Sequence, residues 1–298
     1  MNGGNKVADF QKQTVQWFPG HMAKTRRLIK ESLPLVDAVT ELLDARIPMS
    51  SRNPELDELT QRKPRIVLLN KCDMADEKTT KRWIEYFKAH GQYAIAVDCR
   101  SGKGLNAYRP LVRQVLADKI KSNEEKGMSG KALRVMVVGI PNTGKSSFIN
   151  RMAGRNRAKV ADKPGVTRQN QWFVIGNGIE LLDTPGVLWP KFDDKTVGDR
   201  LAFIGSVKDD VTDTETMALR LLEVLKKDYS DLLCERYKLK PDDVANSETY
   251  EIMELIGRKR GMLISGGEID TERASVMLLD EYRGGKLGRL SFEVPEDY

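Results

Sequence analysis

The sequence predicts an α/β domain followed by a small α-helical domain. Short apolar runs recur through the first part of the chain, and the runs 66–69 and 133–138 end directly before an asparagine and a glycine. Runs of this length are typical of buried strands. In the last third of the chain, apolar residues recur instead at the three- and four-residue spacing of amphipathic helices. We therefore expect a first domain at 1–206, with an N-terminal arm at about 1–30, and a helical domain at 207–298.

A glycine-rich loop follows the apolar run 133–138. Gly139, Gly144, Lys145 and Ser146 match the pattern G-x-x-x-x-G-K-[ST]. Such a loop directs backbone N–H groups and a helix N-terminus at phosphate oxygens. In this motif the lysine reaches the β- and γ-phosphates, and the serine hydroxyl ligates Mg²⁺. The same loop contributes Asn142, Thr143 and Ser147 to the predicted nucleotide site.

A second phosphate-side motif is Asp183-Thr184-Pro185-Gly186, which follows a predicted strand at 178–182. An aspartate at the end of a strand can hold the Mg²⁺ shell, and the Gly186 N–H can sense the γ-phosphate. Alone, this tetrapeptide is a common turn signal, but after a phosphate loop it indicates a nucleotide site. Between the two motifs, Thr167 is placed to complete the Mg²⁺ coordination; the alternative is a Pro-Gly turn with a solvated threonine.

The base-reading motif is Asn70-Lys71-Cys72-Asp73, directly after the apolar run 66–69. The Asp73 carboxylate can accept from both the N1–H and the exocyclic amine of guanine, whereas adenine offers no matching pair of donors. A buried polar group left unpaired is costly, so this site favours GTP and GDP over adenine nucleotides. The loop at Asp98-Cys99 stands where the serine–alanine loop of a GTPase packs on the base. Because that loop works mainly through a backbone N–H, Cys99 is an acceptable replacement.

These motifs occur in a rotated order. In a Ras-like GTPase the phosphate loop comes first, whereas here residues 70–73 precede Gly139. This order predicts a circularly permuted Ras-like P-loop GTPase domain. Two separate nucleotide domains are the alternative, but the sequence holds one phosphate-loop motif. The polar segment at about 118–131 fits the linker between the original ends, because surface connections tolerate permutation. The sheet must then combine strands near 39–43, 66–69 and 93–97 with strands near 133–138, 171–176 and 178–183.

Four further segments carry a resemblance to a known family: Trp17–Met22 (WFPGHM), Asp44–Pro48 (DARIP), Ser51–Pro54 (SRNP) and Tyr282–Arg289. With the motif order, they resemble the circularly permuted GTPases that mature the large ribosomal subunit, of which ribosome biogenesis GTPase A is the bacterial type. The resemblance covers nearly the whole chain. It implies docking on a large ribosomal subunit precursor, with rRNA and ribosomal proteins as partners, and release coupled to GTP hydrolysis.

The hydrolytic residue of Ras-like GTPases is missing. Val187 follows Gly186 where those enzymes carry the glutamine that orients the attacking water, and valine neither donates nor accepts a hydrogen bond. The resemblance implies a catalytic role for His21, with a surface or hydrogen-bonding histidine as the alternative. It also implies K⁺ binding at Asn142, which can offset developing negative charge; a solvent-facing side chain is the alternative there. We expect slow hydrolysis that the ribosomal subunit stimulates.

The charge balance favours a polyanionic partner. The chain has 49 Lys and Arg against 43 Asp and Glu, a net charge of +6. Basic residues gather at 24–30, 258–260 and 283–289. Each cluster alone is expected as a solvated face, but the three together favour contact with RNA phosphates. Without a recognisable RNA-reading module, we expect recognition of RNA shape and backbone.

Composition also indicates the compartment. No apolar run is long enough to span a bilayer, and residues 1–10 lack the apolar region of a signal peptide. We therefore expect a cytoplasmic protein that binds no membrane and is a monomer off the ribosome. Cys72, Cys99 and Cys234 have no metal-ligand spacing and are expected to be reduced thiols.

For four residues the sequence leaves two interpretations open. Trp17 and Phe18 can stack on bases or anchor the N-terminal arm, and Arg46 and Arg52 can contact RNA or brace the loop after the first strand. For the whole chain, the favoured interpretation is an Mg²⁺-dependent GTPase acting in large-subunit assembly. The alternatives are a nucleotide-gated RNA-binding scaffold with incidental hydrolysis and an RNA-modifying enzyme, for which the sequence offers no second cofactor motif.

Overall fold

The computed structural model describes residues 19–60, 62–154, 171–186, 188, 194–207 and 213–298, and for residues 19–23 it describes the backbone alone. These residues form two compact units. The sheet unit lies within 18–190 and also contains the chain end, 289–298, whereas the helical unit lies within 191–288. In the described ranges, no helix combines the length and apolar composition needed to cross a bilayer.

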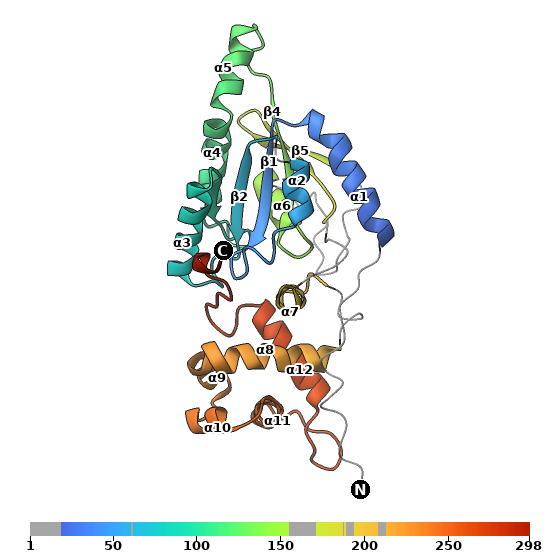
Figure 1. Cartoon of the computed structure of the whole chain (residues 1–298), viewed down its shortest axis with the longest axis vertical. Helices are drawn as coiled ribbons and strands as arrows, with labels where there is room; N and C mark the ends of the chain where they lie inside the picture. The colour runs from blue at the N-terminus through green and yellow to red at the C-terminus, as the bar shows by residue number, and fades with distance from the viewer. Residues whose placement is uncertain (1–18, 61, 155–170, 187, 189–193, 208–212) are drawn as a thin grey trace. The chain divides into compact units, whose positions relative to one another are not determined.

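Six strands of the described chain form one sheet in the order β3-β2-β1-β4-β6-β5 (Figure 1). β5 runs antiparallel to β6, and the other neighbouring pairs are parallel. The three strands that precede the phosphate loop therefore insert beside β4, which confirms the permuted α/β fold expected from the sequence. The strands span Ala38–Asp44 (β1), Arg65–Asn70 (β2), Tyr93–Ala96 (β3), Leu133–Val138 (β4), Gln171–Gly176 (β5) and Ile179–Asp183 (β6).

Side chains alternate along β1 and divide the core into two layers. On one face, Leu42 joins a buried cluster with side chains of α4 and α6, and Thr40 Oγ1 lies 2.8 Å from Tyr108 Oη. On the other face, Val39 packs with side chains of α1 and α2, and Leu43 packs with side chains of α3. The sheet is therefore buried on both faces. The helices of this unit are α1 (Pro19–Ser32), α2 (Pro54–Thr60), α3 (Glu77–Ala89), α4 (Tyr108–Val115), α5 (Ala117–Glu125) and α6 (Lys145–Ala153), with short 3₁₀ turns at Leu33–Leu35, Leu105–Ala107 and Pro295–Asp297.

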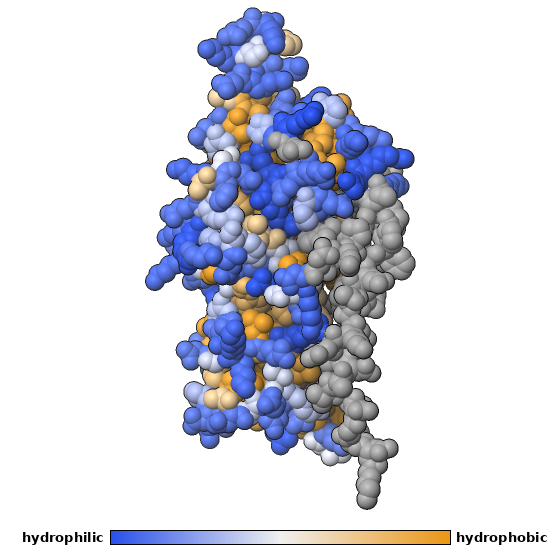
Figure 2. All heavy atoms as spheres, viewed as in Figure 1, coloured by the Kyte–Doolittle hydropathy of each residue, from blue (hydrophilic) through white to orange (hydrophobic). Residues whose placement is uncertain are grey.

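The segment expected as a polar linker, 118–131, is largely helical. α5 covers its first part and projects beyond the end of the sheet (Figure 1), where its surface is mostly hydrophilic (Figure 2). Ile120 and Asn123 are the residues of α5 that pack inward. Lysine, glutamate and alanine all favour helix, so this segment is helical although it buries little.

Several helices of the helical unit start with acidic caps. The Asp213 carboxylate accepts from the Thr216 N–H at the start of α8, and Asp270 accepts from the Arg273 N–H at the start of α12. Apolar residues on one face of each helix, such as Leu221 on α8, form the buried side. The helices are α7 (Lys195–Phe203), α8 (Thr214–Asp228), α9 (Ser230–Tyr237), α10 (Pro241–Asn246), α11 (Thr249–Lys259) and α12 (Thr271–Arg283).

The chain ends in the sheet unit, whereas the sequence expectation placed residues 207–298 together in the helical domain. Leu290 and Glu293 are buried there, each with 1% of the residue exposed, and the Leu290 N–H donates to Met74 O at 2.9 Å. The sequence expectation was based on the helical spacing of apolar residues. That spacing cannot predict where the residues that follow the last helix will pack.

Candidate nucleotide site

The glycine-rich loop joins β4 to α6 and has room only for glycine at two positions. Gly139 has φ +146°, and a Cβ there would lie 2.7 Å from Leu42 O. Gly144 has φ +99°, and a Cβ there would lie 2.2 Å from Asn70 Nδ2. The left-handed backbone and the close approach together explain both glycines. The loop therefore has the glycine cradle expected for phosphate oxygens at the N-terminus of α6.

Lys145 is the first residue of α6, and its ammonium is held back over the loop. Lys145 Nζ donates to Gly139 O and Ile140 O, each at 2.8 Å. Burial lowers the pKa of this lysine to about 8, although the nearby Asp183 carboxylate acts to raise it. An anionic group in the loop would stabilise the charged lysine, so the geometry fits phosphate binding.

The end of β6 reaches the same loop. Asp183 is buried at the end of the strand, and its charge acts on Lys145. The next residue, Thr184, donates from its hydroxyl to Val137 O at 2.7 Å, which fixes the segment against β4. A Cβ on Gly186 would lie 3.0 Å from Lys145 Nζ. The structure thus brings Lys145, Asp183 and Gly186 together as the sequence analysis expects, with Ser146 half-buried in the first turn of α6.

Asn70 links the phosphate loop to the base side of the site. Its amide Nδ2 donates to Thr143 O at 2.6 Å, and its Oδ1 accepts from the Cys99 N–H at 3.0 Å. One buried side chain therefore holds three loops that are far apart in sequence. The Cys99 N–H is engaged by Asn70, so its expected use toward a base stays a prediction.

Lys71 turns away from the strand with φ +61° and lies over a buried carboxylate. Lys71 Nζ is 2.9 Å from Asp44 Oδ2, and Arg46 binds the same carboxylate through Nε at 2.9 Å and Nη2 at 2.8 Å. Burial acts to raise the pKa of Asp44, but the Arg46 and Lys71 charges outweigh it and hold this pKa well below its usual range. Arg46 is 1% exposed. It therefore braces the loop after β1, which decides between its two sequence interpretations.

Asp73 offers the clearest sign of a missing donor. Its Oδ1 is buried, and among the residues that the structure describes it finds no hydrogen-bond partner. Leaving a buried neutral polar group unpaired costs about 1–3 kcal/mol, and leaving a carboxylate oxygen unpaired costs more. The N1–H and the exocyclic amine of guanine supply donors of the kind that this oxygen lacks. The residues present therefore fit a guanine nucleotide.

The Asp98–Gly104 loop is held by its own side chains. Asp98 Oδ1 accepts from the Arg100 N–H at 2.8 Å, and Asp98 Oδ2 accepts from the Ser101 N–H at 3.2 Å. Burial raises the pKa of the Cys99 thiol, so this cysteine stays protonated and unreactive. In the described structure Asp98 shapes the loop; a direct contact with nucleotide stays a prediction.

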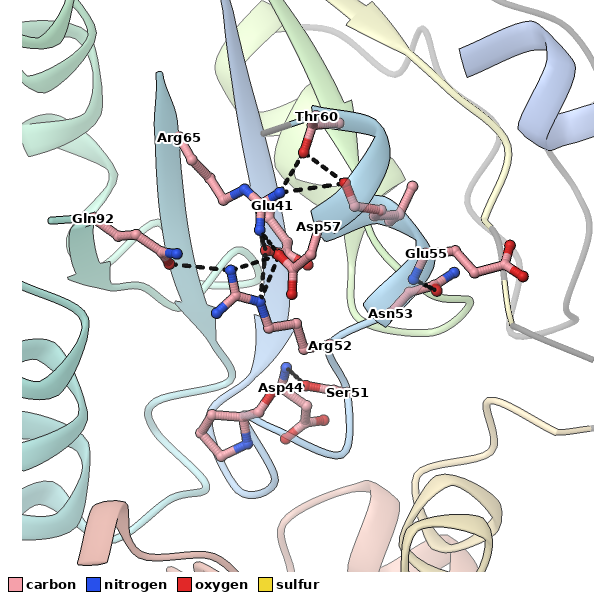
Figure 3. Close-up of polar contacts among 12 residues, drawn as sticks. Glu41, Asp44, Ser51, Arg52, Asn53, Glu55, Asp57, Thr60, Arg65 and Gln92 are labelled. Carbon is pink, nitrogen blue, oxygen red and sulfur yellow. Dashed lines mark hydrogen bonds and ion pairs between the residues drawn. The ribbon is translucent and has the colours of Figure 1, made fainter. Parts of the chain in front are cut away.

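Arg52 belongs to a buried charge cluster on the α2 and α3 face of the sheet (Figure 3). Its Nη2 donates to Asp57 Oδ1 at 2.8 Å and to Gln92 Oε1 at 3.2 Å, and its Nε lies 3.5 Å from Glu41 Oε2. Arg65 Nη1 lies 3.4 Å from the same Glu41 oxygen. The Arg52 side chain is 11% exposed, so it too braces the sheet unit.

Some expected residues fall outside what the structure describes. Thr167, Val187, Trp17 and Phe18 are among the undescribed residues, and for His21 only the backbone is described, within α1. Asn142 is described in the phosphate loop with φ +62°. The roles expected of these residues stay predictions. Sequence reasoning named Asp44 only as part of a segment that carries the family resemblance and gave it no role of its own; its position at the end of a mostly apolar strand was the available signal.

Comparisons with known proteins agree with this geometry. Residues 134–246 match the family model described as 50S ribosome-binding GTPase. Over 286 residues the chain is 47% identical to ribosome biogenesis GTPase A of Bacillus cereus, covering 95% of each protein. It is similar to a GDP-bound structure of TM YlqF, at 34% identity and TM-score 0.64, covering 90% of this chain and 99% of that one. It is also similar to GNP-bound YlqF from T. maritima, at 33% identity and TM-score 0.65, covering 92% and 100%.

Proposed function

This chain belongs to the family of ribosome biogenesis GTPase A, and from that premise we propose that it couples GTP hydrolysis to a late step in assembly of the large ribosomal subunit, or to its own release from that subunit. As a member of this family it is a circularly permuted GTPase that converts GTP to GDP and phosphate. Its proposed partners are the large ribosomal subunit precursor, rRNA and ribosomal proteins, and its proposed compartment is the cytoplasm.

The main observation in favour of guanine specificity is the buried Asp73 Oδ1, which has no hydrogen-bond partner among the described residues. Asn70 and Lys71 hold the loop to which Asp73 belongs. An adenine base presents an acceptor at N1 and would leave this oxygen unpaired. A guanine base presents two adjacent donors. Discrimination between guanine and adenine should be strong, because binding of adenine would leave a buried polar group of the protein unpaired.

The phosphate half of the site divides its work among a few side chains. We assign Lys145 to binding the β- and γ-phosphates and the Gly186 N–H to sensing the γ-phosphate, and the proximity of Gly186 to Lys145 supports this assignment. Ser146 and Asp183, with Thr167 as predicted from the sequence, would hold Mg²⁺, which when bound supplies charge neutralisation at the phosphates. Lys145 keeps its proton in the bound state because phosphate charge opposes the effect of burial.

Slow intrinsic hydrolysis is expected from the sequence after Gly186. Val187 cannot orient water, and we assign that task to His21 in the complex with the partner. Asn142 is the proposed K⁺ ligand. Both assignments rest on the sequence resemblance, and both make activity depend on something the isolated chain does not provide.

The basic clusters differ in how free they are to meet RNA. Arg283 donates to the carbonyl oxygens of Ala202 and Phe203, so it serves the helical unit itself. By contrast, Arg258 and Lys259 at the end of α11 are exposed. We therefore place the proposed RNA contact of the helical unit at the end of α11 rather than at the end of α12.

The test is GTP hydrolysis with and without large ribosomal subunits, in K⁺ and in Na⁺, for wild type and His21→Ala. The proposal expects strong stimulation by subunits, greater in K⁺, and expects His21→Ala to bind subunits without being stimulated. If subunits bind but leave the rate unchanged, the chain is a nucleotide-gated scaffold with incidental hydrolysis. If subunits do not bind, the ribosomal assignment fails.

A further inference from the structure

The last ten residues, 289–298, form a segment that we call the C-terminal strap. The chain leaves the helical unit at 288, and the strap belongs to the sheet unit. Leu290, Ser291 and Glu293 are all buried in it, with exposures of 1%, 9% and 1%. A tail that buries a carboxylate and a hydroxyl must give them partners, and those partners lie on two loops of the nucleotide site.

The first loop is the one after β1. Glu293 Oε2 accepts from the Met49 N–H at 2.7 Å, and Glu293 Oε1 accepts from the Ser50 N–H at 3.0 Å and from the Ser50 hydroxyl. The neighbouring Phe292 N–H donates to Arg46 O at 2.8 Å. A charged acceptor with several donors makes hydrogen bonds stronger than neutral ones, so Glu293 fixes this loop firmly.

The second loop is the one after β2 that carries residues 70–73, which we call the guanine-reading loop. The Leu290 N–H donates to Met74 O at 2.9 Å, and Ser291 Oγ accepts from the Asp76 N–H at 3.1 Å. Met74 directly follows Asp73, whose buried Oδ1 is assigned above to guanine. The strap is thus bonded to the backbone one residue beyond the base-reading carboxylate.

The two attachments act on opposite flanks of the same loop. On one flank, the strap holds the Arg46 carbonyl, and the Arg46 guanidinium holds Asp44, which in turn holds Lys71. On the other flank, the strap holds Met74. Residues 71–73 are therefore fixed between two points that are both tied to one short tail.

The end of the strap is anchored on α3. Trp83 Nε1 donates to Glu293 O at 3.2 Å, and the Tyr298 ring lies 5.8 Å from the Trp83 ring. Glu296 pairs with Arg82 at the surface, where its side chain is 60% exposed. Glu296 therefore carries the same charge as Glu293 within the strap but touches neither loop in the contacts described, which makes it a matched control.

We propose that the C-terminal strap positions Asp73 for the guanine base, with Glu293 as a positioning residue. The proposal rests on the assignment of Asp73 to guanine made above. It implies that guanine selectivity depends on residues 289–298, which lie more than 200 residues after Asp73 in sequence and pack in the same unit. A strap that only adds stability would lower the melting temperature and leave base selectivity unchanged.

The experiment compares affinities for GDP and IDP, since inosine lacks the exocyclic amine that Asp73 reads. The ratio of the two affinities is taken within one protein sample, so a partly inactive sample changes both values equally and leaves the ratio intact. The proteins are wild type, Glu293→Gln, Glu296→Gln and Asp73→Asn, all in the full-length chain. Melting temperatures are recorded in parallel.

We expect wild type to prefer GDP and Glu293→Gln to reduce that preference about threefold to tenfold, the equivalent of weakening one buried hydrogen bond. Glu296→Gln should keep the wild-type ratio. An unchanged ratio in Glu293→Gln, with or without a lower melting temperature, overturns the proposal. If Glu293→Gln does not fold, Ser291→Ala replaces it; this variant removes one acceptor, is expected to reduce the preference about twofold to fivefold, and overturns the proposal if it does not.

Failure of the underlying assignment has a different signature. If wild type binds GDP and IDP equally, or if Asp73→Asn retains the wild-type preference, Asp73 does not read the exocyclic amine of guanine, and the assignment on which the strap proposal rests is wrong. If Asp73→Asn loses the preference while Glu293→Gln and Ser291→Ala keep it, the assignment stands and the strap proposal alone fails.

Discussion

The phosphate loop and the guanine-reading loop lie side by side but are held in different ways. The phosphate loop is shaped mainly by its own glycines, and its lysine bonds to carbonyls of the same loop. The guanine-reading loop is held by groups from elsewhere: the Asp44 side chain at the end of β1, and Leu290 and Ser291 of the strap. The first loop takes its shape largely from its own residues, with one bond from Asn70, whereas the second depends on several segments that only the fold brings together.

The largest effect should come from breaking the point where the loops meet. In Gly144→Ala, the new Cβ would displace the Asn70 amide and break its bonds to Thr143 and Cys99, in addition to the strain of a positive φ. We expect a loss of about 4 kcal/mol or more in nucleotide binding, roughly a thousandfold. Titration calorimetry with GDP measures it.

Gly154→Ala is the matched control for this variant, because Gly154 ends the same helix with φ +68° and a Cβ there would meet nothing within 4 Å. It should cost about 1 kcal/mol of stability and leave affinity unchanged. Equal loss of affinity in the two variants would show that backbone strain, and not contact with Asn70, decides the effect.

The next largest effect tests the remote support of the guanine-reading loop. Asp44→Asn leaves the buried Arg46 and the neighbouring Lys71 without their counter-charge, and we expect a loss of about 3–5 kcal/mol in unfolding free energy. Denaturant unfolding measures it. Glu77→Gln, which breaks exposed ion pairs with Lys81 and Arg289, should change the unfolding free energy much less than Asp44→Asn does.

The same carboxylate predicts a pH dependence. The folded-state pKa of Asp44 is depressed, so its stabilising contribution is present above the unfolded-state pKa, about 3.9, and is lost as pH falls toward the folded-state value. Wild type should therefore lose stability below about pH 4 more steeply than Asp44→Asn. If the stability of the two proteins falls equally steeply with pH in acid, the Asp44 carboxylate is not the source of this pH dependence.

Replacement of Asp73 by asparagine should change the preferred base from guanine towards xanthine. Asp73→Asn presents an amide that matches the N1–H and the C2 carbonyl of xanthine, and no longer matches the two donors of guanine. We expect GDP affinity to fall about tenfold to a hundredfold and XDP affinity to rise. Competition binding with both nucleotides checks it; unaltered preference for GDP would place the base elsewhere.

The smallest effect concerns the phosphate loop alone. Because the pKa of Lys145 is about 8, the lysine of the free protein loses its charge as pH rises through that value, and phosphate binding favours the charged form. Between pH 6.5 and 8.5, GDP affinity should fall about fourfold. Affinity that is flat over this range would mean that Lys145 stays fully charged in the free protein.

The sequence predicted the local half of this site better than the remote half. Gly144, Lys145 and Asp183 follow from contiguous motifs whose chemistry sets their spacing, and the structure brings them together. The motif order also predicted the permuted sheet. The support of the guanine-reading loop was not predictable, because Asp44 and Glu293 are single acidic residues whose partners lie far away in sequence. A charged side chain that points inward carries no periodic signal.

Two other features were left open by the sequence for similar reasons. The segment 118–131 was expected as a polar linker, and α5 forms there because its residues favour helix even with little to bury. For Arg46 and Arg52 the sequence left two interpretations, RNA contact and bracing of a loop. An arginine that faces solvent cannot be distinguished in sequence from one that pairs with a buried carboxylate. Their burial decided the question.

The most direct test of this account is an NMR measurement of the imino proton of ¹⁵N-labelled GDP bound to the wild-type chain. If Asp73 Oδ1 accepts from guanine N1–H, that proton should be visible, protected from exchange with water, and lost from the spectrum of Asp73→Ala, which has no acceptor at this position. An imino proton that exchanges as fast in the complex as in free GDP would show that the buried carboxylate does not read the base.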